Sequence, residues 1–331
     1  MAIEAASLLP VRAQNYQVHD LHSGERIWTE TNCYIDLWIE LLAALGLDPT
    51  PAGACALSAD FLGDQWTFLK YPPEDLRALY GIDVAEMSVW KPVLDHVMEQ
   101  LTFGRLVTVE VDSWWLPDTA GVSYRIDHTK STIVPNVVEP GARRMEYFHN
   151  AGLYVLEGDD FEGIFNLKND DPWILAPYME TVDLTRLDRA ADLGSIAIEL
   201  AGEHLRWAPE GNPVARLGEQ IQRDVPWLQE AGLDAFHLYA FALVRQCGFT
   251  AELAADFSRW LRTTLPNTPN ADRLEQATAE FGAVAQGMKS LQLRLARAAR
   301  GRDVDVSDTV AALAGSWGVA MDAMRTWHGT A

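Results

Sequence analysis

The sequence predicts an α+β fold in which helices and an antiparallel sheet come first and an all-helical part follows. Apolar residues between positions 37 and 45 recur at the i, i+3, i+4 spacing of a helix that buries one face. Runs rich in β-branched and aromatic residues then predict four strands, at 105–112, 128–134, 144–148 and 152–156. Beyond about residue 183 only helical spacing remains. We therefore expect two domains, residues 1–182 and 183–331.

The individual elements follow in chain order. Residues 1–30 lack a long period and are expected to form an arm, and the first helix should begin near Asn32 and end at Gly46. Two shorter helices are expected at 74–81 and 92–104, before the strands. The second half should form a bundle of helices at 187–205, 214–223, 235–246, 251–265, 270–300 and 307–326.

Composition narrows the classes of function. The formal net charge of −21 over 331 residues opposes non-specific binding to DNA or to an anionic membrane. The sequence has no run of eighteen apolar residues and does not begin like a signal peptide, so we expect a cytoplasmic protein. Its three cysteines are widely spaced without a CxxC pair, which predicts neither a disulfide framework nor a metal site, and no cofactor is expected.

Cys33 stands at the start of the first expected helix. Backbone N–H groups without helical partners and the positive end of the helix dipole can stabilise a thiolate there and bind an oxyanion. This is a common setting for a cysteine nucleophile. The alternative is that Cys33 is a small buried apolar residue, which is the commoner role of a cysteine among apolar neighbours.

A histidine and a polar residue follow Cys33 in the chain order of papain-like enzymes. His128 opens a strand, and His149 and Asn150 end a later one. Asp112, at the end of another strand, can orient His128 or cap a turn. His128 can instead form a surface ion pair with its neighbour Asp127.

Five stretches carry a resemblance to known proteins: residues 32–40, 63–68, 109–119, 128–130 and 147–152. They resemble a bacterial family of uncharacterised proteins found in natural-product gene clusters, near which we place the valanimycin-pathway seryl transferase, which takes serine from seryl-tRNA to a hydroxylamine. Residues 111–117 followed by His128 are distantly similar to the N-terminal domain of the butirosin acyltransferase. That domain has a papain-like scaffold and moves an acyl group from a carrier-protein thioester to an amine.

The resemblance implies roles for individual residues. It implies Cys33 as the nucleophile, His128 as the base and Asn150 as the partner that orients the imidazole. His149 competes with Asn150 because adjacent side chains of a strand point to opposite faces, and Asp112 is a third candidate for that role.

Further residues are expected to bind substrate. Gln65 can donate to an oxyanion beside the Cys33 backbone N–H, or make a structural hydrogen bond. Asp118, with Asp64, Asp112 and Asp127, can form an acidic lip that attracts an amine, or face bulk water. The aromatic residues expected to line a pocket or to fill the core are Trp66, Trp114, Trp115 and Tyr124.

We therefore expect a papain-like acyl or aminoacyl transferase with a cysteine nucleophile. Its donor would be an aminoacyl-tRNA or an acyl carrier protein, and its acceptor a small amine, hydroxyl or hydroxylamine. The alternatives are a cysteine peptidase or amidase and a non-catalytic ligand- or carrier-binding protein. An acidic chain can meet a polyanionic donor only through a local basic patch, and the dense basic set is Lys289, Arg294, Arg297, Arg300 and Arg302. The alternative for this set is a solvated helix face.

Overall fold

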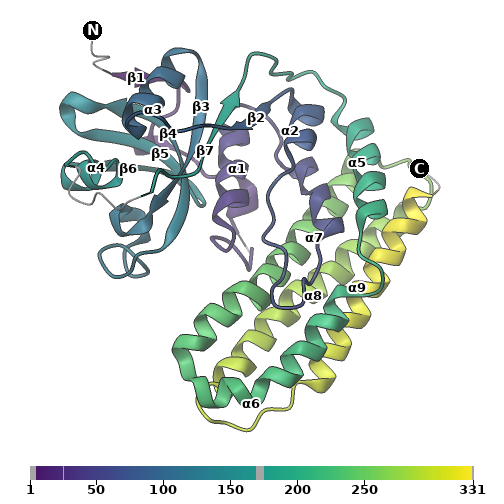
Figure 1. Cartoon of the computed structure of the whole chain (residues 1–331). Helices are drawn as coiled ribbons and strands as arrows, with labels where there is room; N and C mark the ends of the chain where they lie inside the picture. Colours follow the sequence, from purple (N-terminus) through teal and green to yellow (C-terminus); the bar gives the residue numbers. More distant parts are fainter. Residues whose placement is uncertain (1–4, 25, 169–174, 330–331) are drawn as a thin grey trace. The chain divides into compact units, whose positions relative to one another are not determined.

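The computed structural model describes residues 5–24, 26–168 and 175–329, which divide into two compact units (Figure 1). Unit 1 contains Met1–Gly24, Cys33–Pro49 and Pro73–Ala191, and unit 2 contains Glu25–Asn32, Thr50–Pro72 and Asp192–Ala331. Unit 2 thus includes two segments that the expected boundary at residue 182 assigns to the first domain. Trp28 explains one of them, because its buried indole N–H donates to the Ala285 carbonyl at 3.0 Å.

Unit 1 is built on an antiparallel sheet. Among the described residues the strand order is β2-β7-β3-β4-β5-β6, and the short β1 pairs with β4. The strands are β1 (Ala6–Ser7), β2 (Asp83–Glu86), β3 (Arg105–Asp112), β4 (Lys130–Glu139), β5 (Arg144–His149), β6 (Gly152–Glu157) and β7 (Met179–Asp183). The four expected strands are β3 to β6. Strands β1, β2 and β7, which have two to five residues each, were not expected.

In the described part of unit 1 the α-helices are α1 (Cys33–Ala44), α2 (Pro73–Tyr80), α3 (Val93–Thr102) and α4 (Asp159–Ile164). Helix α1 packs against β4 and β5 and has its apolar side chains buried, as expected of a helix packed on an antiparallel sheet. It ends at Gly46, whose φ of 75° favours glycine. The Leu47 N–H then donates to the Leu42 carbonyl and closes the helix.

Unit 2 is helical in its C-terminal segment, as expected. Its helices are α5 (Leu193–Trp207), α6 (Pro213–Ala240), α7 (Gln246–Thr264), α8 (Ala271–Ala298) and α9 (Ser307–His328). Helix α6 replaces the two separate helices expected from residue 214 onward, with Gly232 (φ 81°, ψ −168°) interrupting it. Within the described part of the chain, no helix has the length and apolar character needed to cross a membrane.

Candidate functional site

Cys33 is the first residue of α1, at the place the sequence predicts. Burial raises the pKa of its thiol above the ordinary value, although the positive charge of Lys130 and hydrogen bonding with the Ser131 side chain and the Thr132 backbone act in the opposite direction. The resting sulfur is therefore protonated. This differs from the expectation of a stabilised thiolate, because the loss of solvation outweighs the helix start and these neighbours.

A chain of buried hydrogen bonds begins at Ser131. The Ser131 Oγ lies 2.6 Å from His149 Nε2, and His149 Nδ1 lies 2.5 Å from Asp118 Oδ2. The Tyr147 hydroxyl donates to the other oxygen of Asp118. All four residues belong to unit 1, and the chain joins β4, β5 and the turn at Pro117–Thr119. The expectation that Asp118 forms part of an exposed acidic lip is wrong, because its side chain is only 3% exposed.

His128 forms a second pair with a carboxylate. Its Nδ1 lies 2.5 Å from Asp112 Oδ2, and its ring stacks on Trp114 with the centroids 4.6 Å apart. Of the three partners considered for His128, the structure therefore brings Asp112 to it. Asp127 accepts the His128 backbone N–H instead of pairing with the ring.

The structure does not bring His128 to Cys33. The His128 side chain is 69% exposed, and no hydrogen bond joins it to the sulfur among the described residues. The expectation of a direct Cys33–His128 hydrogen bond is therefore wrong for this structure. Position along β4 explains the difference. His128 precedes the strand, whereas Ser131 and Thr132, which are hydrogen-bonded with the sulfur, are among its first three residues.

Asn150 has a structural role in the β5–β6 hairpin. His149 and Gly152 are register partners, so Asn150 stands at the turn, with a φ of 44°. Asparagine is one of the few residues that tolerate this left-handed conformation. Its side chain makes none of the hydrogen bonds found among the described residues, so the expectation that Asn150 orients the imidazole is wrong here.

A cavity of about 1010 Å³ lies in unit 1. It is lined by residues of β3 and the start of β4, by the chain around α3 and α4, and by the segment before β7. Its polar lining residues include Glu110, Asp112, His128, Lys130 and Tyr178. Cys33 is not among the described residues that line it, but Lys130, whose charge acts on the Cys33 sulfur, is.

Several polar groups of this cavity are paired. Lys130 Nζ lies 3.1 Å from Glu110 Oε1, and the Tyr178 hydroxyl donates to Glu180 at 3.0 Å. Burial and the neighbouring Glu180 raise the pKa of Tyr178 to about 12. The cavity therefore combines carboxylates, a histidine held by a carboxylate and an aromatic wall, which suits a small polar molecule with an amine or hydroxyl group.

The expected aromatic residues have different positions. Trp115 lines the cavity, and the Arg125 guanidinium lies 4.2 Å from its ring centroid. The Tyr124 hydroxyl donates to Asp160 at 2.9 Å, and Tyr124 is not among the described lining residues. Trp114 stacks on the imidazole, as described above. Of the four expected aromatic residues, Trp115 is therefore the one that lines this cavity.

Gln65 and Trp66 belong to unit 2 and not to the unit that contains Cys33. Trp66 is a core residue: its indole N–H donates to the Thr250 hydroxyl at 3.0 Å, and its ring packs edge-on against Trp317. Its expected role in substrate binding is therefore wrong, because the ring is buried in the interior of unit 2. Gln65 is exposed, and its carbonyl accepts the Leu62 N–H in a tight turn.

Five residues of these clusters were not predicted from the sequence: Glu110, Lys130, Ser131, Tyr147 and Tyr178. Alternation along a strand shows which residues share a face, but it does not identify the residue opposite each of them. Ser131 and His149 are eighteen positions apart and meet only through the pairing of β4 with β5. No local signal could have connected them.

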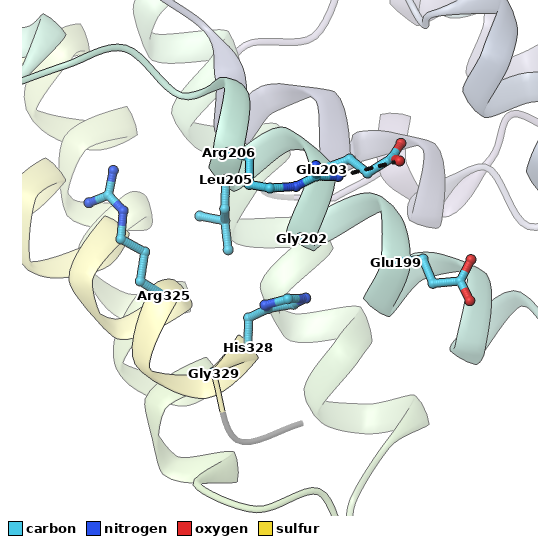
Figure 2. Close-up of a pocket in the computed structure, with 8 residues that line it drawn as sticks. All are labelled: Glu199, Gly202, Glu203, Leu205, Arg206, Arg325, His328 and Gly329. Atoms are coloured by element: carbon cyan, nitrogen blue, oxygen red, sulfur yellow. Dashed lines mark ion pairs between the residues drawn. The ribbon is translucent and has the colours of Figure 1, made fainter.

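A second cavity, of about 570 Å³, lies between α5 and α9 of unit 2 (Figure 2). The His328 ring packs so closely on Gly202 that a Cβ there would lie 2.4 Å from Nε2. Its lining contains two carboxylates of α5 and one guanidinium group from each helix, and Glu203 pairs with Arg206 at 3.5 Å. This mixture favours no single ligand charge. Among the described residues, no group of three or more side chains is arranged to hold a metal ion.

Comparison with known proteins completes the description of the site. No curated protein matches the chain. The profile of the DUF1839 N-terminal domain matches residues 17–184, and that of the DUF1839 C-terminal domain matches residues 190–326. The two matches together span most of the sequence, and the first contains Cys33, Ser131, His149 and the His128–Asp112 pair. The chain therefore belongs to the DUF1839 family.

Proposed function

We propose that this protein is an acyl or aminoacyl transferase in which Cys33 takes up an activated acyl group and passes it to a small amine, hydroxyl or hydroxylamine. The observation that carries the proposal is the position of Cys33 at the first residue of α1, with Ser131 and the Thr132 backbone hydrogen-bonded to its sulfur. The resemblance of the N-terminal stretches to natural-product enzymes and to a papain-like acyltransferase domain supports it.

The reaction has two steps. In the first, the Cys33 sulfur attacks the acyl carbon, a thioester forms and the donor's oxygen or sulfur leaves with a proton. In the second, the acceptor attacks the thioester and the C–S bond breaks. His128 suits the acceptor step, because Asp112 holds its Nδ1 and leaves Nε2 to take a proton from an acceptor in the cavity.

The donor we propose is an aminoacyl-tRNA or an acyl carrier protein, both of which are polyanionic. Arg294, Arg297, Arg300 and Arg302 are exposed at the C-terminal end of α8 and just beyond it. Lys289 differs from them, since its ammonium lies 4.5 Å from the Trp28 ring centroid and burial lowers its pKa. The docking patch we propose therefore consists of these four arginines.

One observation favours a second candidate, a protein that binds a small molecule without acyl transfer. The cavity of about 1010 Å³ has a paired polar lining without Cys33, and the thiol is protonated at rest. In this reading the His128–Asp112 pair recognises a ligand. A hydrolytic reaction, with water as the acceptor, uses the same groups as the transferase and differs from it only in the product.

Intact mass spectrometry tests the proposal. The full chain is incubated in turn with aminoacyl-tRNAs, acyl carrier thioesters and acyl-coenzyme A, and is then weighed. We expect an increase equal to the acyl group in the parent and in Cys247→Ala, a control that removes a fully buried thiol of unit 2, and no increase in Cys33→Ala. If the parent gains no mass with any donor class, the binding protein is the better reading.

A further inference from the structure

We propose that the proton of Cys33 moves through Ser131 to His149, with Asp118 holding the imidazole, and that His128 does not receive it. This inference rests on the proposed function, because it assigns the proton acceptor for the same cysteine. In it, Ser131 contacts the reacting sulfur directly, whereas His149 and Asp118 act through Ser131 and are positioning residues for the proton.

The atoms are connected in the order that such a transfer requires. Asp118 Oδ2 faces His149 Nδ1 at 2.5 Å, so the imidazole carries its proton on Nδ1 and presents the lone pair of Nε2 to Ser131 Oγ at 2.6 Å. This is the connectivity of a Ser–His–Asp triad. Here the Ser131 hydroxyl is also hydrogen-bonded with the Cys33 sulfur, so the sulfur stands at the end of the hydrogen-bond chain opposite Asp118.

The members of this hydrogen-bond chain differ in burial. His149 and Asp118 have side chains that are 1% and 3% exposed, and Ser131 is 7% exposed. Cys33 is the member of the set with intermediate exposure. A donor that contacts Cys33 does not contact the buried imidazole, so we expect a proton going between them to pass through the serine hydroxyl.

The proton count balances in both steps. As the sulfur attacks the acyl carbon, its proton moves to Ser131 Oγ while the Ser131 proton moves to His149 Nε2, and Asp118 stabilises the imidazolium. The proton returns along the same path to the leaving oxygen or sulfur of the donor. When the acceptor later attacks and the C–S bond breaks, a proton supplied by the acceptor returns to the sulfur. No oxidant or further reactant is required.

The charges near the Cys33 sulfur and near His149 favour transfer of the proton from the sulfur to the imidazole. Lys130 faces the sulfur and favours the thiolate, whereas Asp36 of α1 opposes it. At the other end, His149 contacts Asp118, and the Tyr147 hydroxyl also donates to that carboxylate. A transferred proton thus arrives beside a negative charge, and the sulfur it leaves lies near a positive one.

The alternative is that the hydrogen-bond chain from Ser131 to Asp118 serves only to join β4, β5 and the turn at Pro117–Thr119. The two roles differ in their effect on Cys33. A purely structural network changes stability when it is broken but leaves the pH dependence of the sulfur's reactivity unchanged. A relay changes the reactivity of the sulfur at neutral pH in particular, where proton removal by hydroxide is slow.

The test measures alkylation of Cys33 by iodoacetamide in the full chain from pH 6 to pH 11, with peptide mapping to separate the three thiols. One pKa unit corresponds to a tenfold change in thiolate, so at neutral pH we expect Ser131→Ala to react about tenfold more slowly than the parent. At the highest pH the two rates should converge. Ser131→Thr, which keeps a hydroxyl, should restore the neutral rate.

Ser123→Ala is the matched control, because it also removes a hydroxyl that is hydrogen-bonded and buried in unit 1, here to Thr119 Oγ at 3.0 Å. It should alkylate as the parent does. Equal neutral rates for Ser131→Ala and the parent overturn the relay, and so does a loss in Ser131→Ala that is the same at every pH.

Nuclear magnetic resonance of ¹⁵N-histidine in the parent gives a second measurement that needs no folded serine variant. Blocking Cys33 with methyl methanethiosulfonate removes the first proton of the relay, so the ¹⁵N chemical shifts of the His149 ring should change. The same treatment of Cys33→Ala should leave these chemical shifts unchanged. Unchanged His149 resonances in the parent overturn the relay.

These outcomes are separable from failure of the proposed function. An acyl adduct that forms equally fast in the parent and in Ser131→Ala supports the transferase and contradicts the relay. A Ser131-dependent alkylation profile without any acyl adduct supports the relay and contradicts the proposed donors.

Discussion

The hydroxyl of Tyr34 donates a 2.9 Å hydrogen bond to the Oε2 of Glu180 and so ties the first turn of α1 to β7. The same carboxylate oxygen accepts the Thr108 hydroxyl at 2.8 Å, and Thr108 and Glu180 are register partners in the sheet. Glu180 is buried, so these donors replace the water it loses on folding. The Tyr34–Glu180 hydrogen bond therefore fixes the position of Tyr34, the residue that follows Cys33 in α1.

We predict that Tyr34→Phe destabilises the protein by about 1–3 kcal/mol, because it leaves a buried carboxylate with one donor fewer. Urea denaturation monitored by circular dichroism measures this change. Tyr239→Phe is the matched control: it removes a hydroxyl that donates to Asp224 within unit 2. We expect only Tyr34→Phe to lower the rate of Cys33 acylation as well, and an unchanged rate would show that the contact does not position α1.

We predict that stability falls at alkaline pH through His22. Burial alone lowers its pKa, but hydrogen bonds and charges of Asp36 and Glu40 outweigh burial and raise it. The imidazolium lies 3.0 Å from Asp36 and 2.5 Å from Glu40. A raised folded pKa means that the stabilisation is complete below the unfolded value, about 6.5, and is lost as pH rises through the folded pKa.

The melting temperature measured from pH 5.5 to pH 9 tests this prediction. His22→Gln should lower stability by about 3 kcal/mol at acidic pH, since it leaves two buried carboxylates without their cation. The melting temperature of this variant should also not fall at alkaline pH in the way expected of the parent. Parallel curves for the two proteins would show that His22 does not titrate in this range. His237→Gln, in α6 of unit 2, serves as the control.

We predict that Asp112→Asn slows the acceptor step and leaves formation of the Cys33 thioester unchanged. Asp112 contacts His128 and not the sulfur, and an amide there no longer stabilises an imidazolium. A loss of roughly a hundredfold in transfer to an amine acceptor is expected from removal of general base catalysis. Single-turnover measurements with pre-acylated protein separate the steps, and an equal loss in both would place His128 in the first step.

We predict that Arg297→Glu combined with Arg300→Glu weakens use of a tRNA or carrier-protein donor and leaves Cys33 alkylation unchanged. The two exposed arginines belong to the four-arginine patch, and contacts to phosphates weaken with rising salt. Donor kinetics at low and moderate salt measure the effect. The control reverses Arg206 and Arg325, two exposed arginines of unit 2 that change the net charge equally (Figure 2). Identical kinetics in both variants would mean that the patch is only a solvated helix face.

Local pattern was enough to predict α1, the strands β3 to β6 and the place of Cys33. The apolar spacing after residue 37 and Gly46 predicted α1, and β-branched runs predicted β3 to β6, because helix and strand periods are properties of short segments. The helix start also predicted the position of the cysteine correctly. Its expected thiolate was not correct, because solvation depends on what the fold places above the sulfur.

Contacts between distant residues required the tertiary structure. Asp112 was one of three candidates for the partner of His128 until the register of β3 against β4 placed Asp112 opposite Lys130, close to His128. Trp66, expected either at a pocket or in the core, is core of unit 2.

The sequence by itself thus determined the longer helices and strands, and which residue types were available for chemistry. The tertiary structure alone decided that Ser131, His149 and Asp118 form one buried hydrogen-bond chain at Cys33. The physical reason is that periodicity constrains neighbours along the chain, whereas strand register and burial determine which side chains meet across the sheet and which groups lose their water.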